Sequence, residues 1–157
     1  MVQVLIRSAN KKSGTNNDAY YFIDWNRFLK PNTKYEVSFT YTSDGSNIAN
    51  VSTVGKSLPA LLYANFGQSS LDVQNNSNAS SLYFCGLLKW RNLVSASPYT
   101  GFLDADKSTN NIFYINSLPN NEFNIKLYDN TLTLWKDTAG TPAQPANYML
   151  ILNFEEC

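Results

Sequence analysis

The sequence predicts an all-β domain: an antiparallel β-sandwich, and more specifically a jelly roll of roughly 8–10 strands. Short segments alternate apolar and polar residues with a period of two, and clusters of Asn, Ser, Gly, Asp and Pro separate them. No long segment has the 3.6-residue period of an amphipathic helix. Without helices to cover a parallel sheet, two facing antiparallel sheets are the expected way to bury the apolar side chains.

The clearest strand is Lys34–Thr42, in which every odd position is apolar. A second alternating run, Phe123–Leu127, is followed by Asp129-Asn130 and a third run over Thr131–Leu134, and this arrangement predicts a β-hairpin. A short helical turn is expected at Trp25–Leu29. The remaining predicted strands are Val2–Arg7, Ala19–Trp25, Ile48–Val54, Leu61–Phe66, Leu82–Trp90, Asn111–Asn116 and Tyr148–Phe154.

The run Tyr148–Leu152 is apolar at every position. Such a run is expected in a central strand that is covered on both faces, or in one that is paired inside an assembly. No repeat, linker or charge block divides the chain, so residues 1–157 are predicted to form a single β-sandwich domain.

The composition indicates a polar surface that carries few charges. Charged residues make up 15% of the chain, and 21 asparagines supply much of its polarity. Such a surface suits permanent protein contacts, because few charges must be desolvated when a partner binds. Twelve basic residues balance twelve acidic ones, so no nucleic-acid or membrane partner is expected. Without a signal-peptide core or a long apolar segment, synthesis in the cytosol is expected, with no segment embedded in a membrane.

The chain contains no histidine, which is the commonest general base and a frequent metal ligand. All seven glycines are isolated from one another, so there is no glycine-rich phosphate loop. We therefore expect a protein that is not an enzyme, and the sequence assigns no catalytic, cofactor-binding or metal-binding residue.

Two groups of oxygen ligands were weighed. The alternation Asp104-x-Asp106-x-Ser108-x-Asn110 resembles the start of a calcium loop, but Thr109 and Ile115 stand where that loop requires Gly and Glu, so a solvated polar loop is favoured. Glycoside hydrolysis would need two carboxylates across a cleft, and Glu155 and Glu156 are expected on opposite faces of the last strand.

Aromatic residues, sequons and cysteines have simple structural interpretations. Trp25, Trp90 and Trp135 could form a stacking platform for sugars, but each lies in or beside an apolar run, so a core role is favoured. Cys85 is expected to be a small buried apolar residue, and Cys157 a terminal thiol. Three sequons, at Asn50-Val51-Ser52, Asn75-Asn76-Ser77 and Asn78-Ala79-Ser80, are attributed to chance in an asparagine-rich chain.

Four segments in the first third of the chain form a recognisable pattern: Leu5-x-x-Ser8, Ser13-Gly14-Thr15-x-x-Asp18-Ala19, Ile23-Asp24-Trp25 and Lys34-Tyr35-x-Val37-Ser38-Phe39. In these segments, and more weakly at residues 116–121 and in the terminal strand, the chain resembles small jelly-roll virion proteins of large eukaryotic DNA viruses and virophages. The resemblance implies a minor capsid, cement or spike protein of the virion, and it carries over no catalytic residue.

The first hypothesis is therefore a structural component of a virus particle that acts by protein–protein packing. Its expected partners are other capsid proteins and copies of itself, for example as a trimer. The alternative is a carbohydrate- or receptor-binding head domain with a lectin-like or tumour-necrosis-factor-like sandwich, whose partner would be a host glycan or receptor. A histidine-free glycosidase that uses carboxylates is a third hypothesis.

Overall fold

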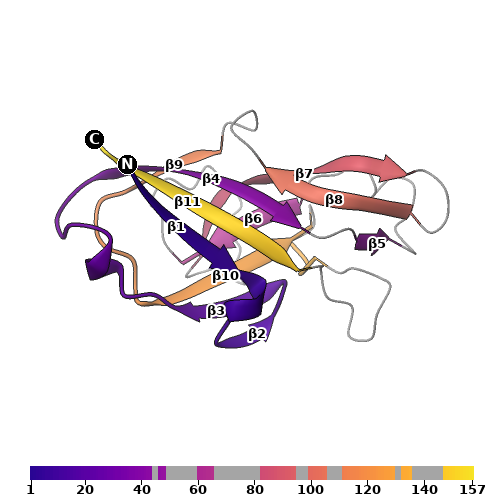
Figure 1. The fold of residues 1–157 in the computed structure, drawn as a ribbon, viewed down its shortest axis with the longest axis horizontal. Helices are drawn as coiled ribbons and strands as arrows, with labels where there is room; N and C mark the ends of the chain where they lie inside the picture. The colour runs from indigo at the N-terminus through magenta and orange to yellow at the C-terminus, as the bar shows by residue number, and fades with distance from the viewer. Residues whose placement is uncertain are drawn as a thin grey trace.

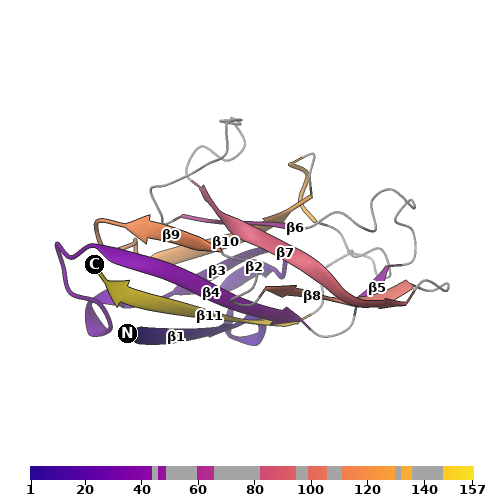
Figure 2. The ribbon, with the colours of Figure 1, turned by 90° about the horizontal axis from the view of Figure 1, so that it is seen from above.

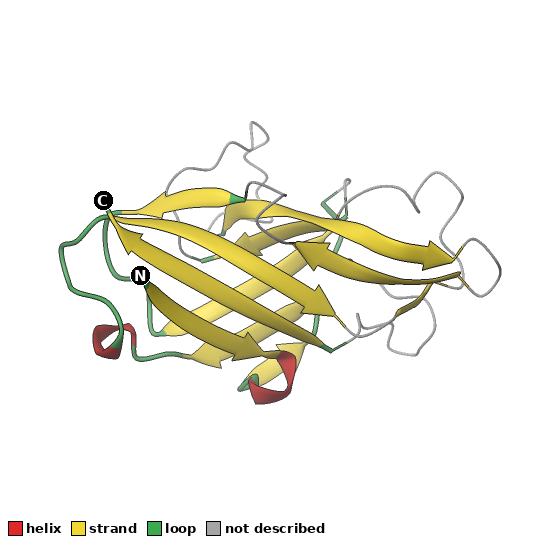
Figure 3. Ribbon diagram, turned by 45° about the horizontal axis from the view of Figure 1, so that its top comes forward, coloured by secondary structure: helices red, strands yellow, loops and turns green. Residues whose placement is uncertain are grey.

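The computed structural model describes residues 1–43, 46–48, 60–65, 82–94, 99–105, 111–129, 132–135 and 147–157, and for 46–48, 90–94 and 99–103 it describes the backbone alone. These residues are all-β, with two 3-10 helices, Ser8–Asn10 and Trp25–Arg27 (Figure 3). The strands are β1 Val2–Arg7, β2 Ser13–Thr15, β3 Asp18–Phe22, β4 Tyr35–Ser43, β5 Ser46–Ile48, β6 Ala60–Ala64, β7 Tyr83–Val94, β8 Tyr99–Ala105, β9 Ile112–Ile115, β10 Glu122–Tyr128 and β11 Tyr148–Glu156.

Eight of the strands form two antiparallel layers (Figures 1 and 2). The first sheet has the order β1–β11–β4–β9, and the second has the order β3–β10–β6–β7, with β2 added outside β3. These eight strands leave out β2, β5 and β8. When they are numbered from first to eighth along the chain, the order in the first sheet is first–eighth–third–sixth, and the order in the second sheet is second–seventh–fourth–fifth. This is the strand order of a jelly roll, so the predicted fold class is confirmed.

The long strand β7 connects the two sheets. Its first half pairs with β6, while its second half, from Lys89, pairs with β8, which in turn touches β4. Asn111 holds the bend from the other side: its amide accepts a hydrogen bond from the Leu87 N–H at 3.0 Å and donates one to the Leu87 carbonyl at 2.8 Å. Gly86 leaves the room for this clamp, because a Cβ there would lie 2.4 Å from the Asn111 side chain.

The core lies between the two sheets and is rich in aromatic side chains. Trp25 is fully buried and contacts Phe123 of the second sheet and Phe154 of the first, with ring centroids 5.4 and 5.8 Å apart. All four apolar positions of the predicted strand Lys34–Thr42 are buried, as the alternation predicts. The predicted turn at Trp25–Leu29 is also confirmed, because the Phe28 and Leu29 N–H groups donate to the Trp25 carbonyl.

The predicted hairpin at Asp129-Asn130 is reduced to a single bridge between Tyr128 and Leu134. The physical reason is that β3 and β6 already pair with the two sides of β10, so no long stretch of that strand is left for a returning arm. The turn is closed locally instead, by a hydrogen bond from the Thr133 N–H to the Asp129 carboxylate at 3.0 Å.

Three short or glycine-containing strands were not predicted: β2, β5 and β8. Strand β2 lies inside a segment whose composition indicates a turn, and it forms a tight hairpin with β3 around Asn16-Asn17. Gly14 makes that hairpin possible, since it adopts a φ of +88° and a Cβ would meet the Asp18 carbonyl oxygen at 2.1 Å. Most of the predicted strand Ile48–Val54 lies outside the described residues.

Candidate functional site

The residues weighed for metal binding do not form a described site. Asp104 lies in β8, where its backbone is in register with Thr42 of β4 and Lys89 of β7. Asp106, Ser108 and Asn110 lie outside the described residues. Within the described part of the chain, no three side chains of the types His, Cys, Asp and Glu group closely enough to hold a metal ion.

Two of the three tryptophans are core residues, as favoured from the sequence. Trp25 is fully buried and its indole N–H donates to the Asn120 carbonyl at 3.0 Å, while Trp135 is 7% exposed. Neither can offer a flat face to a sugar. The side chain of Trp90 and all three sequon asparagines, Asn50, Asn75 and Asn78, lie outside the described residues.

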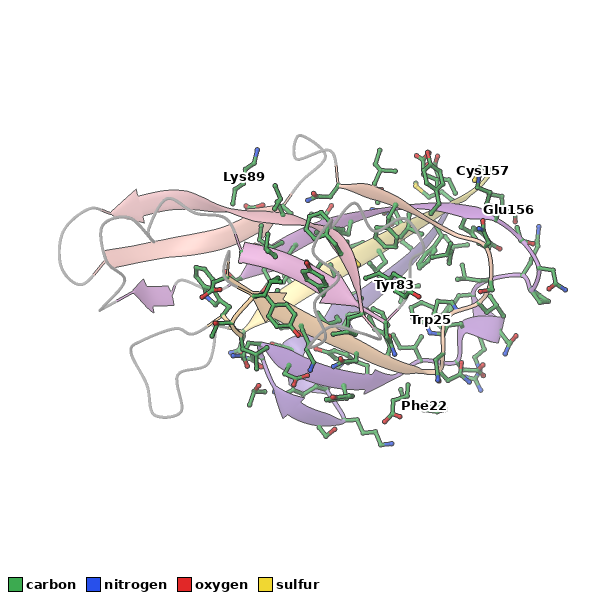
Figure 4. The ribbon with its side chains drawn as sticks, turned by 180° about the vertical axis from the view of Figure 1, so that it is seen from behind. Phe22, Trp25, Tyr83, Lys89, Glu156 and Cys157 are labelled. Atoms are coloured by element: carbon green, nitrogen blue, oxygen red, sulfur yellow. The ribbon has the colours of Figure 1, made fainter. Side chains whose placement is uncertain are left out.

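The two cysteines have opposite environments. Cys85 is buried, and burial raises the pKa of its thiol to about 12, so it is held as the unreactive neutral form. Cys157 is exposed beside Glu156 at the end of β11 (Figure 4). Because β11 continues through Glu156, Glu155 and Glu156 lie on opposite faces of the strand, as expected, and Glu156 pairs with Lys30 at 2.7 Å.

A cluster of tyrosines joins the two sheets in the core. The Tyr21 and Tyr148 hydroxyls lie 2.8 Å apart, and the Tyr41 and Tyr148 rings stack with centroids 5.2 Å apart. Burial raises the pKa of all three phenols. The Tyr41 hydroxyl has no hydrogen-bond partner among the described residues. These phenols stay neutral at physiological pH and are closed off from substrates, which fits a packing role.

The most unusual surface of the described residues is the outer edge of β1. One side of β1 pairs with β11, and no described strand pairs with its other side. In an antiparallel pair, alternate residues direct their N–H and C=O groups away from the partner strand. The free side of β1 therefore presents a row of main-chain donors and acceptors that a further strand could use.

A groove of about 460 Å³ runs beside this edge. Strand β1 forms one wall, and the end of β3 with the segment that follows it forms the other, including Phe22 of β3 and Phe28. These two side chains are 67% and 45% exposed, and Leu5 of β1 is 49% exposed. Figure 4 shows Phe22 at the border of the molecule, well separated from Trp25 in its interior. Apolar side chains exposed on both walls are typical of a contact surface.

The groove also contains charged groups. Arg27 forms an exposed ion pair with Asp24 at 3.2 Å. The side chain of Arg7, the last residue of β1, has no hydrogen-bond or ion-pair partner among the described residues. The sequence assigned no site residue here. The signal was nevertheless present, because residues 2–6 contain neither Pro nor charge, the features that usually protect an edge strand.

The other outer strands are better protected. β2, beside β3, has only three residues, and they are small and polar. β9, which lies at the opposite edge of the first sheet from β1, has only four residues.

Among the described residues no helix is both long and apolar enough to span a membrane. Comparison of the sequence with protein-family models and with curated proteins finds no match in either.

Proposed function

We propose that this protein is a structural component of a virus particle, and that it acts by packing against neighbouring protein subunits. The observation that carries the proposal is the open edge of β1 with its apolar groove. An unprotected apolar edge on a soluble domain is a liability unless a partner covers it. A jelly roll with such an edge is suited to assembly.

The surface chemistry of the first sheet supports the same role. Apart from Glu36 and Glu155 at one end, its outer face carries amide, hydroxyl and apolar side chains along β11 and β4, including Asn153, Thr40 and Ile151. Such groups can be covered by a partner at a small desolvation cost, whereas a face of lysines and glutamates would resist burial. The resemblance of the first third of the sequence to virion jelly rolls indicates the kind of assembly.

The proposal is tested by mass spectrometry of purified particles of the virus whose genome encodes this chain. We expect the protein in particles at a fixed copy number relative to the main capsid subunit, and expect it to resist a salt wash. Its absence from particles, with abundant free protein in infected cells, would contradict the viral role.

Glycan binding is retained as an alternative on one observation. In the groove, the exposed rings of Phe22 and Phe28 lie with the polar side chains of Asn10 and Asp24, and sugars bind to such mixtures of aromatic and polar groups. A glycan array decides between the two functions. Specific binding that is lost in Phe22→Ala and kept in Tyr83→Ala, which removes another exposed ring, would favour this alternative.

A further inference from the structure

We infer that the partner at the β1 edge is a second copy of this chain, whose β1 pairs antiparallel with the first around a twofold axis. The inference rests on the proposed packing role and names the partner of that same surface. Pairing two β1 edges would join the two first sheets into one continuous sheet and would satisfy the free main-chain groups of both strands at once.

The register of such a pair follows from the alternation of side chains. Val4 and Ile6 point into the core, whereas Leu5 and Arg7 are exposed. Inward residues stay opposite inward residues whenever the twofold axis passes at a residue position and not between two residues. We choose Val4, the centre of residues 1–7, opposite its own copy, which places Leu5 opposite Gln3 and Arg7 opposite Met1 of the other chain.

Charge complementarity distinguishes a second copy from an arbitrary strand. Within each chain, Val2 is in register with Phe154, so Glu155 lies next to the start of β1, at the end opposite Arg7. The antiparallel arrangement therefore carries each Arg7 to the Glu155 end of the other copy. Two strand spacings separate the backbones there, about 10 Å, which the two side chains can span.

A cation would be favourable on the outer face of the first sheet near Glu155, because two carboxylates lie side by side there. Glu155 of β11 lies directly opposite Glu36 of β4, on the same outer face. Like charges in this position destabilise a sheet. Within the described residues the Glu36 carboxylate accepts a hydrogen bond from the Tyr114 hydroxyl at 3.0 Å, and no cation is bound to Glu155. An arginine from a second copy would relieve the repulsion twice in each dimer.

A charge-swap series measured by sedimentation equilibrium at low salt tests the inference. We expect a dimer for the native protein, about tenfold or greater weakening in Arg7→Glu and in Glu155→Arg, and recovery in the double variant, because the swap restores both pairs. High salt should reduce these differences. Lys89→Glu makes the same charge change in the half of β7 that pairs with β8, away from β1 (Figure 4), and should leave the dimer intact.

An apolar pair of variants tests the edge itself. Leu5→Lys adds a charge at the proposed interface and should dissociate the dimer by at least about tenfold, since an unpaired charge resists burial. Ile112→Lys is the matched control, because Ile112 is 46% exposed on β9, on the opposite side of the same sheet. A dimer broken by Ile112→Lys and not by Leu5→Lys would overturn the inference.

Disulfide trapping tests the register directly, and its variants introduce no charged side chain into the proposed interface. In a Cys157→Ser background, a Gln3→Cys chain mixed with a Leu5→Cys chain should cross-link rapidly under mild oxidation, because opposed residues have Cα atoms about 4.5–5.5 Å apart. Each variant alone should cross-link much more slowly. Equal rates in all three samples would overturn the register.

The failures of the two proposals are distinguishable. A native protein that is monomeric at about 100 µM, well above the micromolar range of specific association, yet is found in particles would overturn the β1 pairing and leave the viral role standing. A dimer trapped through Gln3 and Leu5 but absent from particles would overturn the viral role and leave the pairing standing.

Discussion

The central strands of the two sheets, β10 and β11, have burial patterns that reverse what their sequences predict. β10 alternates apolar with polar residues, yet Asn124 is only 6% exposed and Tyr128 only 5%. The β11 run Tyr148–Leu152 is apolar throughout, yet Met149 is 47% exposed. β11 is central in its sheet but is covered on one face only in the single chain, so of the two alternatives for this run, pairing inside an assembly stays a prediction.

The difference arises from what packs on each outer face. On β10, Asn124 donates to the Asp18 carboxylate and the Ala19 carbonyl, and its N–H donates to Asn65. The Tyr63 ring meets Tyr128 edge-on at 5.2 Å. On β11, the outer face is exposed at Met149 and only half-buried at Ile151 and Asn153 in the part of the chain that the structure describes. A polar strand can thus be buried when partners satisfy it, and an apolar strand can be left for another molecule to cover.

The largest expected effect separates the two faces of β11. Leu150 is 1% exposed, so Leu150→Ala should lower the free energy of unfolding by about 2–5 kcal/mol. Met149→Ala, one residue earlier on the exposed face, should cost less than about 0.5 kcal/mol in the monomer. Urea denaturation of both variants measures the difference. Equal losses would show that the outer face is also covered.

The next effect compares two asparagines. Asn124→Ala should cost about 1–3 kcal/mol, because it removes the hydrogen bonds from the buried amide to the Asp18 carboxylate and the Ala19 carbonyl. Asn153→Ala on β11 removes one exposed contact, the hydrogen bond from Gln3, and should cost less than about 0.5 kcal/mol. Thermal unfolding with calorimetry checks the order. A larger loss for Asn153→Ala would contradict the contrast between the two strands.

Alkaline pH probes the tyrosines that join the inner faces. Because burial raises the folded-state pKa of Tyr41 and Tyr148 above the unfolded value of about 10, their neutral forms stabilise the fold fully below that pH. Above pH 10 the unfolded chain loses protons that the folded chain keeps. Stability should then fall by up to about 1.4 kcal/mol per pH unit for each such tyrosine.

Tyr41→Phe sharpens this pH test, since the Tyr41 hydroxyl has no hydrogen-bond partner among the described residues. We expect stability at pH 7 to be unchanged or higher, and the loss of stability between pH 10 and pH 12 to be smaller than in the native chain. Denaturation curves at a series of pH values report both quantities. An unchanged alkaline slope would contradict the burial of this phenol.

The smallest effect compares two lysines. Lys126 of β10 pairs with Asp18 at 3.4 Å, and both side chains are about three-quarters buried, so Lys126→Met should cost about 0.5–1 kcal/mol. Lys30 pairs with Glu156, the last residue of β11, and both side chains are more than half exposed, so Lys30→Met should leave stability unchanged within error. Adding salt should reduce the difference in stability between the native protein and Lys126→Met only slightly.

Alternation along single strands was enough to predict the fold class and most inward-facing residues. The apolar positions of β4 are buried where the period of two places them, and the Trp25 turn forms where expected. The hairpin after β10 is shorter than predicted, with one bridge between Tyr128 and Leu134, because the pairing of a strand depends on its competitors. β3 and β6, both far away in the sequence, take the sides of β10.

The candidate site was predictable only in part. The absence of protective residues from Val2–Ile6 is visible in the sequence, but nothing there indicates that β1 pairs on one side only or that Phe22 and Phe28 form the facing wall. Asn124 shows the same limit, because its partners Asp18 and Asn65 are distant in the chain.

The sequence by itself determined which side chains face inward, since the strand period places successive residues on opposite faces wherever the strand lies. It also determined which side-chain groups the protein contains, with many amides and no imidazole. The tertiary structure alone decided which strands became neighbours, which outer face was covered and which edge stayed open. These outcomes depend on contacts between distant segments, such as Val2 with Phe154, that no local pattern encodes.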